Sequence, residues 1–124
     1  MLARHGIWVL SVCLLVGALV APAADARRKP TKRERTAILR ALHERAGCFA
    51  YPAGTCHEVV RVSTARKGWS AVYIRPTRGN ENAVQSDVAS LKRRNGRWRV
   101  HQLGNGGGCG VPRAVVRDLK LACY

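Results

Sequence analysis

The residues best suited to chemistry are basic and flank an Asn95-Gly96 pair. Arg97, Arg99 and His101 follow this pair at alternate positions, so they are predicted to share one face of a strand. The predicted anion-binding residues are Lys92, Arg93, Arg94, Arg97, Arg99, His101, Arg61 and Arg75. Clustered cations bind polyanions through Coulomb attraction and counterion release, without a shaped site. A solvated basic face with no partner is the alternative interpretation.

A second set of residues offers acid–base chemistry. His57, Glu58 and His101, together with many arginines, invite comparison with small secreted ribonucleases, which use Glu, His and Arg on a sheet. Adjacent strand residues point to opposite faces, so His57 and Glu58 cannot serve one site. His101 would need Glu58 or Asp87 as its carboxylate, and His43 is expected on the flank of a helix. No catalytic residue is assigned.

The glycine-rich segment 104–110 lies between a predicted strand and a predicted helix. This order can bind phosphate through exposed N–H groups. The segment contains neither Gly-Lys-Ser/Thr nor a G-x-G-x-x-G run in the right frame, and no strand follows the helix. We therefore interpret it as a flexible connector anchored by Cys109 and predict no cofactor.

Cys48, Cys56, Cys109 and Cys123 remain once the N-terminal apolar segment is set aside. An even number of cysteines in a short exported chain predicts two disulfides. Loop-closure entropy favours the nearest pairs, 48–56 and 109–123. A helix between 109 and 123 would hold its ends apart unless the chain doubles back, so the other pairings stay open. The spacings do not fit a zinc site, and no metal is predicted.

Residues 1–26 have the pattern of a signal peptide. Arg4 precedes a continuous apolar run, and Ala24-Asp25-Ala26 fits an A-x-A cleavage pattern. We expect cleavage after Ala26 and secretion, although a retained membrane anchor is the alternative because the run is just long enough to span. Residues 27–30, RRKP, are predicted to be a disordered basic arm.

The remaining chain has the size and charge of one small basic domain, assigned to residues 31–124. Without Arg4 and Asp25, the chain from Arg27 keeps 21 basic and 6 acidic residues, a net charge of +15. Such a charge attracts polyanions, although arginine richness can also reflect genome composition and solubility. The expected partner is an anionic polymer or an acidic protein outside the cell. No sequence-specific nucleic-acid binding is expected, because Trp69 and Tyr73, which could stack on bases, resemble core residues. The protein is expected to be a monomer.

The elements that must position these residues alternate from helix to sheet to helix. Thr31 and Glu34 form a capping-box pattern, and Ile38 and Leu42 belong to an apolar stripe that Gly47 is predicted to end. Asn95-Gly96 predicts a type I′ hairpin turn. The predicted strands span 57–64, 69–75, 83–92 and 97–103, and a final helix spans about 112–120. The fold class is therefore α+β: an N-terminal helix packed on a four-stranded antiparallel meander sheet, a short C-terminal helix and two disulfides.

Several short motifs carry a resemblance. Cys48-Phe49, Val62-Ser63-Thr64, Trp69-Ser70-Ala71, Arg97-Trp98-Arg99-Val100 and the segment from Cys109 to Cys123 make the chain similar to uncharacterised small secreted actinobacterial proteins. At the level of the fold, the order of a helix followed by a meander is similar to cystatin-like and NTF2-like domains. The resemblance implies an α+β fold and no particular activity.

The sequence thus favours a non-enzymatic binding module for an anionic partner of the cell envelope or the extracellular space. One alternative is a protein-binding inhibitor that acts through loop 49–55 or the Asn95-Gly96 turn. A ribonuclease-like hydrolase is the other.

Overall fold

The computed structural model describes residues 27–124, so the predicted signal peptide lies outside the described residues. Four strands form one antiparallel sheet in the order β1-β2-β3-β4. The helices and strands are α1 (Lys32–His43), β1 (Cys56–Val62), β2 (Trp69–Pro76), β3 (Asp87–Arg94), β4 (Arg97–Leu103) and α2 (Arg113–Asp118), with a 3₁₀ turn at Cys48–Ala50. The predicted α+β meander with two helices is confirmed.

Helix α1 begins as the sequence predicted. The backbone N–H of Glu34 donates to Thr31 Oγ1 at 3.1 Å, and the backbone N–H of Thr31 donates to Glu34 Oε1 at 2.9 Å. These two bonds satisfy donors that a helix end leaves unpaired. The predicted end at Gly47 is wrong, because the helix ends at His43. Gly47 has φ 132°, outside the left-handed helical region, and a Cβ there would lie 2.7 Å from the His43 ring.

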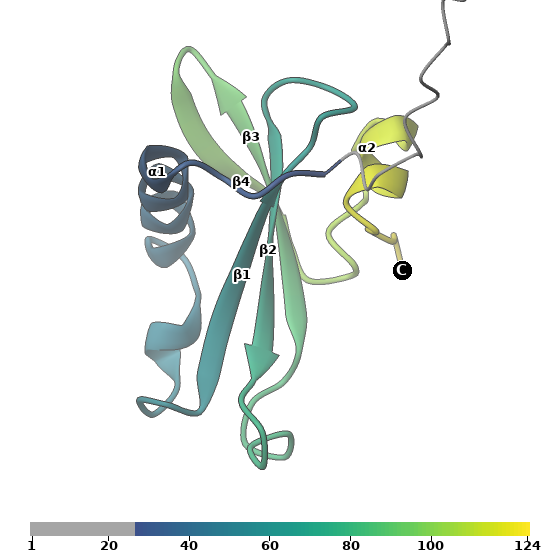
Figure 1. Cartoon of the computed structure of the whole chain (residues 1–124). Coiled ribbons are helices and arrows are strands. Elements are labelled where there is room, and N and C mark those ends of the chain that lie inside the picture. The colour runs from purple at the N-terminus through teal and green to yellow at the C-terminus, as the bar shows by residue number, and fades with distance from the viewer. Residues whose placement is uncertain (1–26) are drawn as a thin grey trace, which may run out of the picture.

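One face of the sheet, the α1 side, carries the first half of the core (Figure 1). Ile38 and Leu42 of α1 are fully buried against Val60, Val72 and Leu91 of the sheet. Burying a side chain of this size stabilises the fold by roughly 1.5–3 kcal/mol. The apolar stripe read from the sequence therefore fixes α1 across the sheet.

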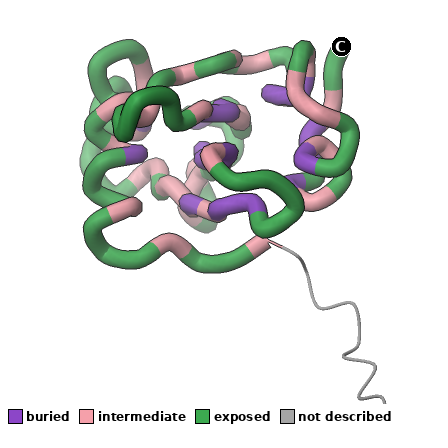
Figure 2. Tube along the Cα trace, turned by 90° about the horizontal axis from the view of Figure 1, so that it is seen from above, coloured by how far each residue is buried: buried purple, intermediate pink, exposed green. Residues whose placement is uncertain are grey.

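The opposite face, the α2 side, is also covered, so the sheet lies between two layers (Figure 1). Val115 and Leu119 of the α2 segment are fully buried and pack with Trp69, Ala71 and Tyr73 of β2. In Figure 2 the buried positions lie inside a rim of exposed loops and turns. Trp69 and Tyr73 are core residues, as predicted.

The β3–β4 hairpin contains the predicted turn and one irregularity. Asn95 and Gly96 have φ of 51° and 76°, as a type I′ turn requires. Strand β3 begins at Asp87 rather than at Ala83, because residues 80–84 form a turn. The register shifts between Ser90 and Leu91, where three residues of β4 lie opposite two of β3, so the strand bulges at His101.

Both nearest-neighbour disulfides are present: Cys48–Cys56 and Cys109–Cys123. The second one closes because α2 is only six residues long and the chain reverses at Lys120, which has φ 51°. Ala122 then pairs with the glycine segment, and the two cysteine Cα atoms lie 4.8 Å apart. The glycine segment, predicted to be a flexible connector, packs closely on the end of the chain: a Cβ on Gly108 would lie 2.7 Å from the Ala122 carbonyl oxygen.

The N-terminal arm differs from the disordered segment predicted for residues 27–30. Arg28 exchanges two backbone hydrogen bonds of 2.8 Å with Val62 at the edge of β1. Its guanidinium also forms a bidentate pair with Glu34, with N–O distances of 2.7 and 2.8 Å. The arm therefore crosses the end of β1 and places Arg27 on the α2 side.

Candidate anion-binding site

Six of the eight predicted basic residues divide between two regions of the sheet. Lys92 lies 5.1 Å from the Trp69 ring centroid, so it is on the α2 side, and its register partner Arg99 shares that face. Arg94 and Arg97 also pair with each other, two residues farther along. We call these four residues, Lys92, Arg94, Arg97 and Arg99, the hairpin patch.

Two members of the predicted cluster lie elsewhere. Arg93 pairs with Trp98, which packs on the α1-side core, so Arg93 belongs to the opposite face. The His101 ring contacts Trp69 edge-on at 5.1 Å, and its Nε2 lies 2.9 Å from the Cys109 carbonyl oxygen. His101 thus packs against the segment that follows β4.

The bulge at His101 changes which face β4 presents. Strict alternation predicts Gln102 on the face of Trp98 and Val100, but Gln102 Oε1 accepts a 2.7 Å hydrogen bond from the backbone N–H of Cys109. His101 and Gln102 therefore hold the same residue, one at its carbonyl and the other at its N–H. This pair fixes the disulfide-bonded segment against the sheet.

A cleft of about 590 Å³ opens on the α2 side, at the other end of the sheet from the hairpin patch. Its floor comes from alternate residues of neighbouring strands, because Val59 and Tyr73 are register partners and Tyr73 also pairs with Val88. The cleft residues are Arg27, Val59, Arg61, Tyr73, Arg75, Ser86, Asp87, Val88, Gly106, Lys120, Ala122 and Tyr124. Arg61 and Arg75 were among the predicted residues.

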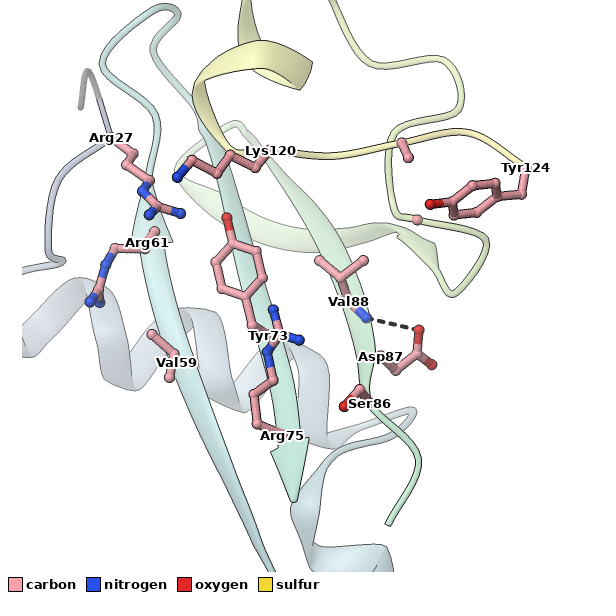
Figure 3. A pocket seen from close by; sticks show the side chains of 12 residues that line it. Arg27, Val59, Arg61, Tyr73, Arg75, Ser86, Asp87, Val88, Lys120 and Tyr124 are labelled. Atoms are coloured by element: carbon pink, nitrogen blue, oxygen red, sulfur yellow. Dashed lines mark hydrogen bonds between the residues drawn. The ribbon is translucent and has the colours of Figure 1, made fainter. Parts of the chain in front are cut away.

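The cations lie along the length of the Tyr73 side chain. In Figure 3 the side chains of Arg27 and Lys120 approach each other above that hydroxyl, and Arg75 lies beside the Tyr73 ring. The Arg75 guanidinium carbon is 5.8 Å from the ring centroid. Arg61 Nη1 donates to the Val60 carbonyl oxygen at 2.8 Å.

Tyr73 is held neutral and in place. Its hydroxyl donates to the Leu119 carbonyl oxygen, and its side chain is buried. Burial raises the pKa of Tyr73, while a hydrogen bond with Arg27 and the charges of Arg27, Arg61 and Arg75 act in the opposite direction. The phenol is therefore a fixed polar group among cations.

One carboxylate side chain lines the cleft. Asp87 lies across Val88 from the cations in Figure 3, and its Oδ1 accepts a 2.8 Å hydrogen bond from the Val88 N–H. Four basic side chains and one acidic side chain give the lining an excess of positive charge. Guanidinium groups bind carboxylate and phosphate oxygens through paired N–H donors.

The sequence did not predict Arg27 or Lys120 as site residues. Arg27 reaches the cleft only because Arg28 pairs with Val62, and Lys120 only because the chain reverses after α2. Both depend on contacts distant in the sequence. The positive φ at Lys120 leaves no mark in the sequence, because lysine is not a residue that favours this conformation.

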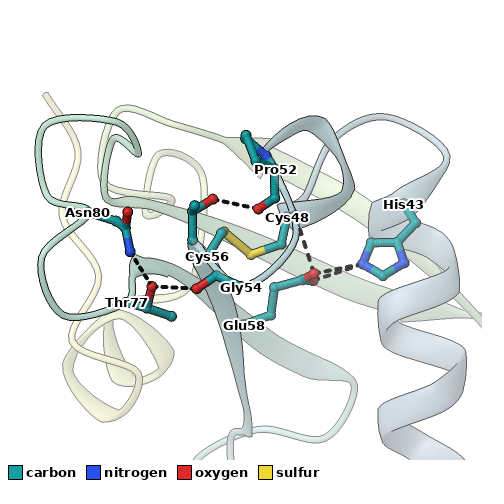
Figure 4. Close-up of a disulfide and its surroundings, with 9 residues drawn as sticks. His43, Cys48, Pro52, Gly54, Cys56, Glu58, Thr77 and Asn80 are labelled. Carbon is teal, nitrogen blue, oxygen red and sulfur yellow. Dashed lines mark hydrogen bonds and ion pairs between the residues drawn. A yellow bond between two sulfur atoms is a disulfide. The ribbon is translucent and has the colours of Figure 1, made fainter.

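Sequence reasoning also missed a histidine–carboxylate pair, His43 and Glu58. His43 Nε2 lies 2.9 Å from both carboxylate oxygens of Glu58, whose Oε1 also accepts a 3.3 Å bond from the Cys48 N–H (Figure 4). Glu58 was considered as a partner for His101, but it lies on the α1 side beside the Cys48–Cys56 disulfide. The pair joins the end of α1 to β1.

Neither a cluster of three or more potential metal ligands nor a helix able to cross a membrane occurs within residues 27–124. The chain matches no family model, no curated protein and no solved structure.

Proposed function

We propose that this protein is a secreted, non-enzymatic module that binds an anionic partner, such as a polymer of the cell envelope or an acidic protein. The observation that carries the proposal is the distribution of charge on the α2 side of the sheet. The hairpin patch presents four cations, and the cleft adds four more with one carboxylate side chain. Such a surface attracts polyanions over several ångströms and releases their counterions on binding.

The two disulfides support the location. Disulfides persist in oxidising compartments, so Cys48–Cys56 and Cys109–Cys123 suit a protein that works outside the cytoplasm. The proposed export by a cleaved signal peptide places the basic face where teichoic acids, anionic lipids and extracellular nucleic acid are found.

Co-sedimentation tests the proposal. The protein would be mixed with bacterial cell walls, anionic vesicles or RNA at about 50 mM and 200 mM salt, where a protein contacting several phosphates loses affinity steeply. The double variant Arg97→Gln/Arg99→Gln should bind less than Arg33→Gln/Arg35→Gln, which removes the same charge from the exposed surface of α1. Absence of salt-sensitive binding to all three materials would contradict the proposal.

One observation favours the alternative of a protein-binding inhibitor. Phe49 is 64% exposed on the loop that the Cys48–Cys56 disulfide closes. A large exposed aromatic side chain on a constrained loop is a frequent anchor at protein interfaces. This alternative predicts a stoichiometric complex that survives high salt and is lost in Phe49→Ala, whereas the basic-face variants retain it.

The ribonuclease-like hypothesis gains no support from the geometry. Its candidate His101 contacts the Cys109 carbonyl and Trp69, while Glu58 contacts His43 and the Cys48 N–H. A ribonuclease assay on the purified protein and on His101→Ala tests it directly.

A further inference from the structure

We propose that the cleft is a binding site for a phosphate group, an inference that rests on the proposed anion-binding function and assigns a ligand class to it. The hairpin patch and the cleft are both basic, but they differ in shape. The hairpin patch lies on paired strands beside an exposed turn, whereas the cleft is a hollow of about 590 Å³. That volume is within the range of sites that hold small molecules.

The segments that carry the cations are fixed by separate parts of the fold. The backbone of Arg28 is bonded to β1, so Arg27 enters the cleft from a held segment. Arg75 lies against the Tyr73 ring, and Tyr73 is itself bonded to the Leu119 carbonyl. Lys120 follows directly in a turn that the Cys109–Cys123 disulfide closes. Because the segments that carry these cations are ordered before binding, no loop has to fold around the ligand, which favours a defined ligand over diffuse attraction.

The charge of the cleft selects phosphate over a lone carboxylate. Its lining carries four basic side chains and the carboxylate of Asp87, which lies on the far side of Val88. A phosphate ester carries about 1.5 to 2 negative charges at neutral pH and three acceptor oxygens. Those oxygens can accept from Arg27 and Lys120, whose side chains approach each other near the Tyr73 hydroxyl, while Arg75 adds positive charge farther along the Tyr73 ring (Figure 3).

The rest of the cleft leaves room for the group that carries the phosphate. Val59, Val88 and Ala122 supply apolar surface, and Tyr124, which is 91% exposed, stands at the rim. The ligand is therefore a phosphorylated small molecule or the phosphate of a lipid headgroup. Both present the same chemistry to the arginines.

Calorimetric titration of the purified protein with inorganic pyrophosphate tests the site. Glycerol 3-phosphate represents a phosphorylated small molecule, and vesicles of phosphatidic acid represent a lipid phosphate. Succinate, a dicarboxylate, tests whether carboxylates bind as well. Arg27→Gln and Lys120→Gln should each weaken pyrophosphate binding about tenfold or more, as expected for the loss of a charge-assisted hydrogen bond. Arg97→Gln, which removes the same charge from the hairpin patch, should change it less than about twofold.

Each outcome decides the inference. Equal loss in the cleft and hairpin variants, or succinate binding as tightly as pyrophosphate, would overturn the phosphate site. Absence of pyrophosphate binding with co-sedimentation intact would overturn the site and leave the proposed function standing, and loss of both would overturn the two together. Circular dichroism of each variant shows whether the fold is retained. Because the two cleft variants lie on different segments, a folding defect in one leaves the other as a test of the site.

Discussion

The hairpin patch and the cleft are two basic regions on the same side of one sheet, and they are built in different ways. The patch comes from a single hairpin whose residues are neighbours in the sequence. The cleft is assembled from the N-terminal arm, three strands and the segment after α2. Local sequence thus suffices to place charge on a hairpin, while a hollow that fixes charges in position requires contacts between distant segments.

The strongest way to separate the two regions is to remove the Cys109–Cys123 disulfide. Cys109→Ser/Cys123→Ser should lower the free energy of unfolding by about 3 kcal/mol, because the closed loop contains about 15 residues. The freed segment carries Lys120 and Ala122, so pyrophosphate binding should be lost while polyanion binding by the hairpin patch persists. Denaturant unfolding and titration measure the two effects.

The matched control removes the other disulfide. Cys48→Ser/Cys56→Ser should cost about 2–3 kcal/mol by the same loop entropy, but this loop lies beside α1 and does not line the cleft. If both double variants lose pyrophosphate binding equally, the cleft does not depend on the segment that Cys109–Cys123 closes. The distinction between the cleft and the hairpin patch would then fail.

A methyl group added to Gly106, which lines the cleft, should destabilise the fold through contact with Ala122. The Cβ of Gly106→Ala would clash with the Ala122 carbonyl, and Gly106 has φ 81°. We expect the free energy of unfolding to fall by at least about 2 kcal/mol, because the strain of a positive φ adds to the clash. Thermal unfolding measures it.

Gly79→Ala is the matched control for Gly106→Ala. Gly79 has a similar φ of 87°, but a Cβ there would meet open space. Its cost should be about 1 kcal/mol, the strain alone. Equal losses in the two alanine variants would show that the approach of Ala122 contributes nothing to stability.

His101 tests whether the predicted anion-binding set was read correctly. If the ring mainly holds Cys109, His101→Phe should retain polyanion binding and lose about 1 kcal/mol of stability, since one hydrogen bond disappears while the contact with Trp69 remains. If His101→Phe instead lost as much polyanion binding as Arg99→Gln, His101 would be part of the binding surface. Co-sedimentation of the two single variants distinguishes these results.

Much of the fold was predictable because its signals are local. The capping box at Thr31, the type I′ turn at Asn95 and the alternation of β4 up to Val100 each depend on a few neighbouring residues. The disulfide pairs followed from loop length, although their closure required a chain reversal at Lys120 that no residue type indicated.

The cleft was predictable only in part, for the same reason. Arg61 and Arg75 were predicted to extend the basic surface of the hairpin from neighbouring strands, but the structure places them in the cleft, whose other residues depend on long-range pairing. The β4 bulge was not predicted either, because no Gly or Pro marks the point where His101 and Gln102 turn toward Cys109. Asp118 ends α2, where a carboxylate is unfavourable to the helix dipole, but its Oδ2 accepts from the Ser63 hydroxyl and from the Thr64 N–H, which are distant in the sequence.

The smallest expected effect concerns the arm that carries Arg27 to the cleft. Hydrogen bonds with Arg28, and to a smaller extent with Thr31, lower the pKa of Glu34 from 4.5 to about 2, although burial acts in the opposite direction. A carboxyl group whose pKa is lower in the folded state stabilises the fold above its unfolded pKa, and this stability is lost as the pH falls from about 4.5 toward 2. Because the Arg28 side chain is 46% exposed, solvent screening limits the contribution to about 1 kcal/mol.

Glu34→Gln should therefore reduce stability by about 1 kcal/mol at pH 7, and the difference from the wild type should shrink as the pH approaches 2. Glu44→Gln, at the other end of α1, removes an exposed carboxylate and should change stability by less than about 0.5 kcal/mol. Urea unfolding across this pH range measures both variants. If the Arg28–Glu34 pair also fixes Arg27, Glu34→Gln should weaken pyrophosphate binding about twofold. Polyanion binding by the hairpin patch should stay unchanged. An equal change in both kinds of binding would mean that the arm acts only through net charge.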